Sequence, residues 1–460
     1  MRASALGPSR GLGAGATGPA LARAAGLAAL TGIGVLLGVA LGLNPVPLPL
    51  VLVTGVGLVG VLALAVWRYE AAVGLGLLLM PFVRIEPAPV DAVFAIVIAF
   101  AAVTGQFDLR RVPFSMAGLA GLFIALNLLS VIDAVDMERA LVFVSITVYL
   151  LFFAIWVTGY VDRGERAGQV VRLYVFGAVV SAALASVALF AAFPGSVYLI
   201  SSDGMRATGL FKDSNVYGPF LVPAALFVVE EGLRPRLLRL GRPMALLCFA
   251  ILTVGVVLSY SRAAWVNFAV GVLAMTVVMA LRRGGSRPAL ALVVVLVTAL
   301  SAVTATVLVT GSAEFLEQRA RFQTYDSQRF GAQRSGIEFA ERYPIGIGPG
   351  QFELLSPVSA HSTYVRALAE EGILGAAALL GLLLGTLVFA LRNAVLGRTA
   401  YGIGSTALLA AWCGIMVNSA VVDTLHWRHL WVLAGLIWVA AMRPPPDQAP
   451  STEAGLAAVR

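Results

Sequence analysis

The sequence predicts an all-α polytopic membrane helix bundle, with about 12–14 transmembrane helices and one large extracytoplasmic loop that contains amphipathic helices. Hydrophobic residues make up 59% of the 460 residues and charged residues only 12%, and the mean hydropathy is +0.91. A soluble domain does not have this composition. Apolar runs of roughly 17–25 residues recur, which is the length that a helix needs to cross a bilayer. They are too long and unbroken for the strands of a membrane barrel.

Each apolar run is interpreted as one crossing. The run at 71–83 is short and also compatible with a re-entrant segment, which gives the predicted range of about 12 to 14 helices. The first run is long for a signal peptide and many spans follow it, so we predict a retained first helix. The fourteen candidate spans are 24–43, 48–66, 71–83, 89–104, 114–131, 141–160, 173–193, 216–230, 243–258, 264–281, 289–310, 363–391, 402–422 and 429–442.

The two termini and one internal segment lack such runs. Cys248 and Cys413 both fall within apolar runs, which favours small buried hydrophobic side chains rather than a disulfide or a metal site. The predicted segments are a disordered cytoplasmic N-terminus (1–23), a transmembrane helix bundle (24–310), an extracytoplasmic loop (311–362), C-terminal transmembrane helices (363–442) and a cytoplasmic tail (443–460).

Arginine carries almost all of the net charge of +8, because Lys212 is the only lysine. Most arginines lie in short loops, where they orient the chain in the plasma (inner) membrane rather than recruit nucleic acid. With both termini in the cytoplasm, the cytoplasmic side collects Arg68, Arg110, Arg111, Arg163, Arg166, Arg172, Arg234, Arg236, Arg239, Arg242, Arg282, Arg283, Arg287, Arg392, Arg398 and Arg443. The polar segments left on the extracytoplasmic side are 194–214, 259–262, 311–362 and 423–428.

Two basic residues precede the 216–230 span on the extracytoplasmic side. Arg206 and Lys212 can bind an anion beside the N-terminus of that helix. The alternative is an ordinary capped loop, with Ser214 or Asn215 as the cap.

Arg262 lies between two spans that leave almost no loop. It is therefore expected near the hydrocarbon boundary, where an arginine usually faces a cavity or a partner. Snorkelling to the lipid head groups is the alternative.

The stretch 327–342 is predicted to be an amphipathic helix that lies on the membrane or over a cavity and ends before Pro344. The glycine-rich stretch 346–350 that follows can form a nest of backbone amides for an anion. Glycine and proline are also common in loops after helices.

The arginines of this helix differ in their neighbours. Arg334 and Arg342 each have Glu338 four residues away, which is the spacing of a surface ion pair. Arg329 has Gln333 at that spacing instead, which makes Arg329 the stronger candidate for contact with a ligand.

His361 stands at the start of the 363–391 span. The positive end of a helix dipole disfavours a charged imidazole, so we expect His361 to be neutral near pH 7 and able to accept a proton. A lone histidine is also common as a polar cap or a packed side chain. Glu370 and Glu371 lie about two turns deeper, and Arg366 has the spacing to pair with Glu370.

These residue types together indicate phosphate chemistry. Arginine can donate two parallel hydrogen bonds to phosphate oxygens, and a neutral histidine can accept a proton from a hydroxyl. The sequence has no nucleotide-binding loop, no metal-ligand spacing and no cytoplasmic domain for ATP. We therefore predict a reaction without metal or nucleotide cofactor, on a lipid-linked phosphate that supplies its own activation energy.

The same residues occur in a recognisable order: Arg206, Gly209-Leu210-Phe211, Asn215, Ser261-Arg262, Arg329, Pro344-Ile345-Gly346-Ile347-Gly348, Ala360-His361-Ser362-Thr363-Tyr364 and Glu371-Gly372-Ile373-Leu374-Gly375. Over residues 200–390 this order and spacing resembles the O-antigen ligase and polymerase superfamily of multi-spanning membrane glycosyltransferases. The chain departs from the pattern at Gln333, where an aromatic residue is frequent. It departs again where Asp213-Ser214-Asn215 replaces the commoner Pro-Asn pair.

The resemblance implies transfer of a glycan from an undecaprenyl-diphosphate carrier to an acceptor hydroxyl on the extracytoplasmic face. It also implies that neither metal nor nucleotide takes part. Carried over, His361 is the catalytic base, and Arg262 and Arg329 hold the diphosphate. The predicted substrate-binding residues are Arg206, Lys212, Asn215, Tyr364 and Glu371. The implied partners are the lipid-linked glycan donor, a glycan, lipid or protein acceptor, and the bilayer, with no nucleic acid.

Several activities share this pattern. Within the superfamily they are ligation of a glycan to a lipid core, polymerisation of cell-surface polysaccharide, and protein O-glycosylation by an oligosaccharyltransferase. From another class, a transporter or flippase of a glycolipid would carry charges at mid-membrane and inverted repeats. Here the charges gather at one face and no repeat is evident, which favours the enzyme.

Overall fold

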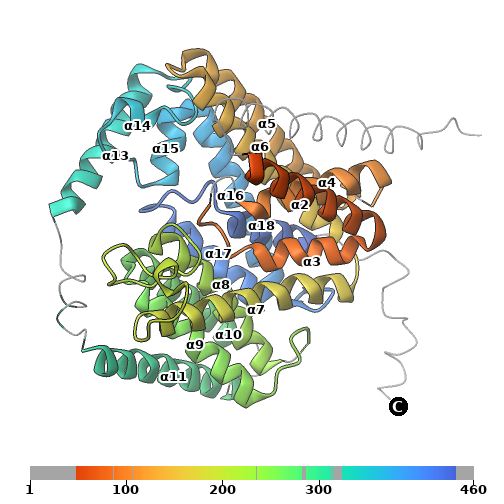
Figure 1. Cartoon of the computed structure of the whole chain (residues 1–460), viewed down its shortest axis with the longest axis vertical. Helices are drawn as coiled ribbons and strands as arrows, with labels where there is room; N and C mark the ends of the chain where they lie inside the picture. The colour runs from red at the N-terminus through yellow and green to blue at the C-terminus, as the bar shows by residue number, and fades with distance from the viewer. Residues whose placement is uncertain are drawn as a thin grey trace, which may run out of the picture.

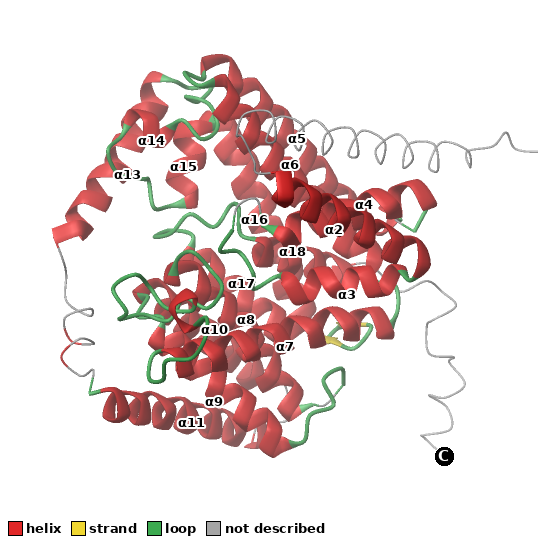
Figure 2. Ribbon diagram, in the orientation of Figure 1, coloured by secondary structure: helices red, strands yellow, loops and turns green. Residues whose placement is uncertain are grey.

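The computed structural model describes residues 48–85, 88–106, 108–234, 236–281, 286–311 and 324–441, together with Glu314 and Glu317. The predictions for residues 1–23, 24–43 and 443–460 lie outside the described residues. The described part is almost wholly helical, which confirms the predicted fold class (Figures 1 and 2). Its α-helices are α2 (Leu48–Trp67), α3 (Tyr69–Leu79), α4 (Pro89–Thr104), α5 (Phe114–Ser130), α6 (Met137–Tyr160), α7 (Gly164–Ala188), α8 (Ser214–Leu233), α9 (Arg242–Leu258), α10 (Arg262–Leu281), α11 (Ser286–Thr310), α13 (Thr324–Arg342), α14 (Phe352–Leu355), α15 (Thr363–Glu370), α16 (Gly372–Val395), α17 (Ser405–Asn418) and α18 (Arg428–Ala441).

Short elements complete the described part. The 3-10 turns are η1 (Leu109–Arg111), η2 (Val131–Asp133) and η3 (Ser196–Tyr198). A small antiparallel hairpin joins β1 (Thr399–Ala400) to β2 (Ile403–Gly404).

Among the described helices, six are long and apolar enough to cross a membrane: α5 with η2, α6, α7, α8, α10 and α16. Shorter apolar helices of 10–17 residues accompany them, and they include α3, α4, α9 and α17. The chain is therefore a multi-pass membrane protein.

The helix α8 is the most enclosed of the six candidate spans, with 83% of its apolar window buried. It packs against α7, α9, α10 and α17 near the centre of the bundle (Figure 1). Glycines make this approach close. A Cβ on Gly218 would lie 2.7 Å from Ala264 Cβ of α10, and one on Gly255 would lie 2.7 Å from Leu221 Cδ1. Interiors are packed too densely to absorb such overlaps, so α8 fixes the positions of its neighbours.

The bundle has two chemically different ends, and α6 runs between them. With 24 residues, α6 is about 36 Å long. Its C-terminal end lies among the loops that the sequence predicts to be cytoplasmic, where Arg166 pairs with Glu70 at 3.1 Å and Arg111 bonds Tyr401 at 3.2 Å. Its N-terminal end lies beside the loop after α13, because Asp136 N donates to Gln351 Oε1 at 2.8 Å. The longest loops in Figure 2 are on the side that carries α13.

The structure corrects two predicted spans. The span expected at 173–193 is α7, which begins and ends earlier, at Gly164 and Ala188. The stretch 363–391, expected as a single helix, is divided into α15 and α16 at Gly372. Gly372 has a φ of +71°, and a Cβ there would lie 2.3 Å from Pro344 O. Gly346 has a φ of +104°, and its Cβ would lie 2.2 Å from Glu370 O. The backbone around Gly346 and the backbone around Gly372 therefore contact each other so closely that only glycine fits at both positions. This contact ends α15.

The predicted amphipathic helix is α13, which ends before Pro344 as expected. It packs on α15 through Gly336, which faces Val365 and Phe352. The predicted pair of Arg334 and Glu338 is present on the exposed face at 3.7 Å.

Candidate active site at one end of the bundle

The helix α8 begins beside Arg206 and Lys212, and its start differs from the prediction. Asp213, rather than Ser214 or Asn215, is the N-cap, and its Oδ1 accepts from Asn215 N at 2.9 Å. A carboxylate is a strong cap because it also complements the positive end of the helix. The side chain of Asn215 is thereby released for contacts outside its own helix, and Lys212 is exposed.

Asn215 joins two pieces that are far apart in the sequence. Its Oδ1 accepts from Arg206 Nη2 at 3.3 Å and from Ser261 Oγ at 2.8 Å. Arg206 Nε also donates to Ser259 O at 3.0 Å. The loop that holds Arg206 is therefore fastened to the turn that precedes Arg262.

Arg262 is the first residue of α10 and is half-buried. Ser261, just before it, accepts from Ala264 N at 3.4 Å while it donates to Asn215. This short turn between α9 and α10 leaves Arg262 at the end of the bundle, beside Arg206. The predicted convergence of these two pieces therefore occurs in the structure.

His361 lies just before α15, on a strained backbone. Its φ of +46° is in the left-handed region, which a non-glycine residue adopts only where its surroundings hold it. The next residue, Ser362, caps α15 by accepting from Val365 N at 3.4 Å. Backbone strain at a half-buried histidine is typical of a functional position, although it does not define the function.

The surroundings of His361 favour its neutral form. Burial lowers the pKa of the imidazole first, and the guanidinium of Arg329 lowers it further, while Asp213 and Asp423 act in the opposite direction. The direction agrees with the sequence prediction, but the cause is desolvation and a nearby cation rather than the helix dipole. His361 therefore lies within electrostatic range of α13, of the start of α8 and of the loop before α18.

Arg329 reaches this place from α13. It is half-buried, and its helix is joined to the loop after α17 by Gln333, whose Nε2 donates to Ala420 O at 3.4 Å. All four predicted pieces, carrying Arg206, Arg262, Arg329 and His361, thus gather at one end of the bundle. We call these four residues the histidine–arginine cluster.

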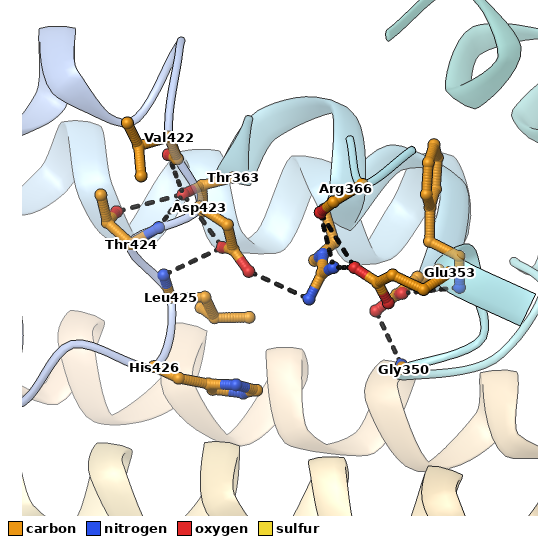
Figure 3. Close-up of polar contacts among 12 residues, drawn as sticks. Gly350, Glu353, Thr363, Arg366, Val422, Asp423, Thr424, Leu425 and His426 are labelled. Carbon is orange, nitrogen blue, oxygen red and sulfur yellow. Dashed lines mark hydrogen bonds and ion pairs between the residues drawn. The ribbon is translucent and has the colours of Figure 1, made fainter. Parts of the chain in front are cut away.

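Figure 3 shows a second group of charges, which we call the ion-pair network. Arg366 pairs with Glu353 and, at 3.1 Å, with Asp423, and its side chain is only 8% exposed. Arg139 of α6 pairs with Glu353 at 3.2 Å. The predicted pair of Arg366 with Glu370 is not formed, because the tertiary fold offers Arg366 two closer carboxylates.

Glu370 is bound by the glycine-rich loop. Its Oε2 accepts from Gly350 N at 2.8 Å and its Oε1 accepts from Phe352 N at 3.0 Å. Of the predicted nest at 346–350, only the Gly350 amide bonds a carboxyl group, and that group is the buried side chain of Glu370 in the same chain. The nest is therefore part of the scaffold that holds α15, and we do not assign it to substrate.

Asp423 is a residue that the sequence did not single out. It accepts from Thr363 Oγ1 at 3.3 Å and from Leu425 N at 3.1 Å, and it pairs with Arg366 (Figure 3). It is also one of the two carboxylates that raise the pKa of His361. The available signal was that Asp423 is the one acidic residue of the polar segment 423–428, which was predicted to be extracytoplasmic.

Two of the predicted substrate-binding residues have internal contacts. The hydroxyl of Tyr364 donates to Met416 O at 2.8 Å, and the buried Glu371 accepts from Asn127 Nδ2 at 3.1 Å. Roles for both in binding substrate stay predictions. No group of three or more His, Cys, Asp or Glu side chains suited to a metal ion occurs among the described residues.

Residues 247–380 match the family described as O-antigen ligase. This match over part of the chain supports membership of the O-antigen ligase superfamily. The matched segment contains Arg262, Arg329 and His361, whereas Arg206 lies upstream of it. No curated protein matches the chain. The same match supports, in general terms, a membrane glycosyltransferase of the ligase or polymerase type.

Proposed function

We propose that this O-antigen ligase relative transfers a glycan from an undecaprenyl-diphosphate carrier to an acceptor hydroxyl, at the extracytoplasmic face of the plasma membrane. The observation that carries the proposal is the position of Arg329 beside His361, with Arg206 and Arg262 at the same end of the bundle. A cation and a neutral imidazole are the two groups that departure of a diphosphate and attack by a hydroxyl require.

In the proposed reaction, the acceptor oxygen attacks the anomeric carbon of the donor glycan. Its proton passes to His361, and the bond between that carbon and the diphosphate oxygen breaks. The electron pair of this bond leaves with the lipid diphosphate. Because burial and Arg329 lower the pKa of His361, the imidazole is free to accept the proton at neutral pH.

Arg262 and Arg329 are proposed to hold the departing diphosphate. Both are half-buried, where a guanidinium interacts with an anion more strongly than in bulk water. Arg206, Lys212 and Asn215 are proposed to bind the donor from the α8 side. The departing diphosphate supplies the driving force of the proposed transfer.

Asp423 is proposed to position the base. It pairs with Arg366 and raises the pKa of His361, so it can favour the imidazolium that forms when the proton is transferred. Its hydrogen bonds to Thr363 and Leu425 hold the carboxylate at the start of α15.

A glycolipid transporter or flippase remains the candidate from another class. Transport needs charged groups along a path through the membrane. The histidine–arginine cluster instead lies at one end of the bundle, which favours chemistry on a substrate already present at that face. Among transferases, the acceptor distinguishes a ligase from a polymerase and from a protein O-oligosaccharyltransferase.

The test uses purified protein in vesicles, with an undecaprenyl-diphosphate glycan and an acceptor, and measures release of the lipid carrier. We expect His361→Ala to slow release by about 10²–10⁴-fold, the usual contribution of a general base. The thermal unfolding of this variant should match that of the unaltered protein. Unchanged release in a folded His361→Ala protein would rule out this residue as the base.

The arginine assignment has a matched control on the same helix. Arg329→Ala should slow release strongly, whereas Arg334→Ala should not, because Arg334 is 84% exposed and pairs with Glu338. Arg329→Lys should restore only part of the rate, because lysine cannot donate bidentate hydrogen bonds to a diphosphate. Equal losses in the two alanine variants would contradict a specific role for Arg329. The glycan length of the product separates polymerase from ligase.

A further inference from the structure

A cavity of about 680 Å³ opens at the other end of α6, away from the histidine–arginine cluster. Its lining comes from the junction of α2 and α3, the end of α4 and the first turns of α7. The residues that matter are Arg68, Glu70, Gln106, Arg166, Gln169 and Arg172. This end of the bundle is the one that the arginine pattern predicts to be cytoplasmic.

Hydrogen bonds hold the floor of this cavity in place. Gln169 Nε2 donates to Glu70 O at 2.6 Å, and Tyr160 donates to Gln169 Oε1 at 2.6 Å. The carboxylate of Glu70 is compensated by Arg163 and by Arg166, which is 3.1 Å away. Arg166 also pairs with Asp162 at 3.1 Å, so two arginines face two carboxylates and the floor is close to neutral.

The remaining charge of the cavity belongs to two exposed arginines. The side chain of Arg68 makes no hydrogen bond or ion pair with any other residue that the structure describes. Arg172 uses one nitrogen, Nη1, to donate to Leu237 O at 3.1 Å. The acid that opposes them, Glu165, has an 81% exposed side chain and lies 3.8 Å from Arg163. Two guanidinium groups thus face the opening.

An apolar stripe leads along α2 to this opening. Val56, Val59, Leu62 and Val66 recur at helical spacing and are 74%, 67%, 48% and 64% exposed. Trp67, which directly precedes Arg68, is 89% exposed. An apolar helix face that ends in a tryptophan and then an arginine is typical of the boundary between acyl chains and head groups.

We propose that the cavity binds a phosphate group, and that its occupant is the head group of an anionic phospholipid in the adjacent leaflet. Arg68 and Arg172 contact the phosphate from two sides, because both line the same opening and guanidinium groups bind phosphate oxygens in pairs. The acyl chains lie along the exposed stripe of α2. Basic pockets between transmembrane helices are suited to such head groups.

The phosphate chemistry alone would also fit a soluble phosphate ester. The stripe on α2 favours the lipid, since a soluble ligand has no use for an apolar path to the membrane interior. This site does not depend on the proposed glycan transfer, because it lies about the length of α6 from His361.

The test is native mass spectrometry of the full chain, purified in detergent and titrated with phosphatidylglycerol or with phosphatidylcholine. We expect Arg68→Gln/Arg172→Gln to weaken binding of phosphatidylglycerol by about tenfold and to leave phosphatidylcholine unchanged. The matched control is Arg110→Gln/Arg392→Gln, which removes two exposed arginines that lie outside the cavity. It should bind phosphatidylglycerol like the unaltered protein.

Two outcomes would overturn the proposal. Equal losses in the two double variants would mean that the basic face as a whole, rather than this cavity, attracts the lipid. Displacement of phosphatidylglycerol by an equal concentration of glycerol phosphate would mean that the site takes soluble phosphates. Thermal unfolding of each variant shows whether it is folded. The single variant Arg68→Gln repeats the binding test without breaking any hydrogen bond or ion pair between described residues.

Discussion

The ion-pair network and the histidine–arginine cluster differ in the burial of their arginines: Arg366 of the network is buried, whereas Arg206, Arg262 and Arg329 of the cluster are half-buried. In the network, Arg366 is 8% exposed and lies between two carboxylates, Glu353 and Asp423. In the cluster, Arg206 donates to the neutral oxygens of Ser259 and Asn215, and Arg329 lies near an imidazole.

This difference separates structural from functional charge. A buried ion pair surrounded by its own partners holds elements together, and here it joins α6, α14, α15 and the loop before α18. Half-buried arginines at the end of the bundle keep part of their surface accessible, so they can contact an anion. Asp423 belongs to the network and acts electrostatically on His361 of the cluster, so a change in the network can alter the surroundings of His361.

The largest expected effect is on the network. Arg366→Ala should destabilise the protein by about 3–5 kcal/mol, because it leaves Glu353 and Asp423 without their shared cation in a largely buried place. Thermal unfolding of the purified variant measures this. Arg334→Ala, which removes an exposed arginine, is the control, and a similar loss in both would erase the distinction between the two groups.

A smaller effect is expected where α13 meets α15. A Cβ on Gly336 would lie 2.4 Å from Val365 Cγ1, so Gly336→Ala should cost about 1–3 kcal/mol through overpacking. It should also slow glycan transfer, because α13 carries Arg329. The matched variant Gly331→Ala meets nothing within 4 Å, and it should gain about 0.5–1 kcal/mol from helix propensity. Equal stability of the two variants would show that α13 does not depend on this contact.

The smallest effects concern the pKa of His361, followed by NMR of the labelled imidazole. Arg329→Gln removes a cation and should raise this pKa, whereas Asp423→Asn removes a carboxylate and should lower it. A protonated imidazole cannot act as the base, so transfer should fall as the pH drops through this pKa, below the ordinary value of 6.5. The acidic limb should move to higher pH in any Arg329→Gln protein with measurable activity. Shifts of the same sign in both variants would contradict the arrangement around His361.

Local patterns predicted the helices well. The hydrophobic runs placed α4, α5, α9 and α10 within two residues of their observed bounds, and Pro344 marked the end of α13. Hydropathy and proline act over a few residues of chain, so their consequences can be read without the fold. The break at Gly372 was missed, because it depends on a contact with a backbone segment about 26 residues away.

The sequence by itself determined that the chain is a helical membrane protein, which end of each span carries arginine, and which residues resemble the O-antigen ligase pattern. Only the tertiary structure decided which charge meets which. In the fold, Arg366 forms an ion pair with Asp423 rather than with Glu370, and Glu370 accepts a hydrogen bond from Gly350 of the glycine-rich loop. Asp423 lies close enough to His361 to raise its pKa. The physical reason is that apolarity and helical period are local, whereas partners among similar charges are chosen by which helices pack together.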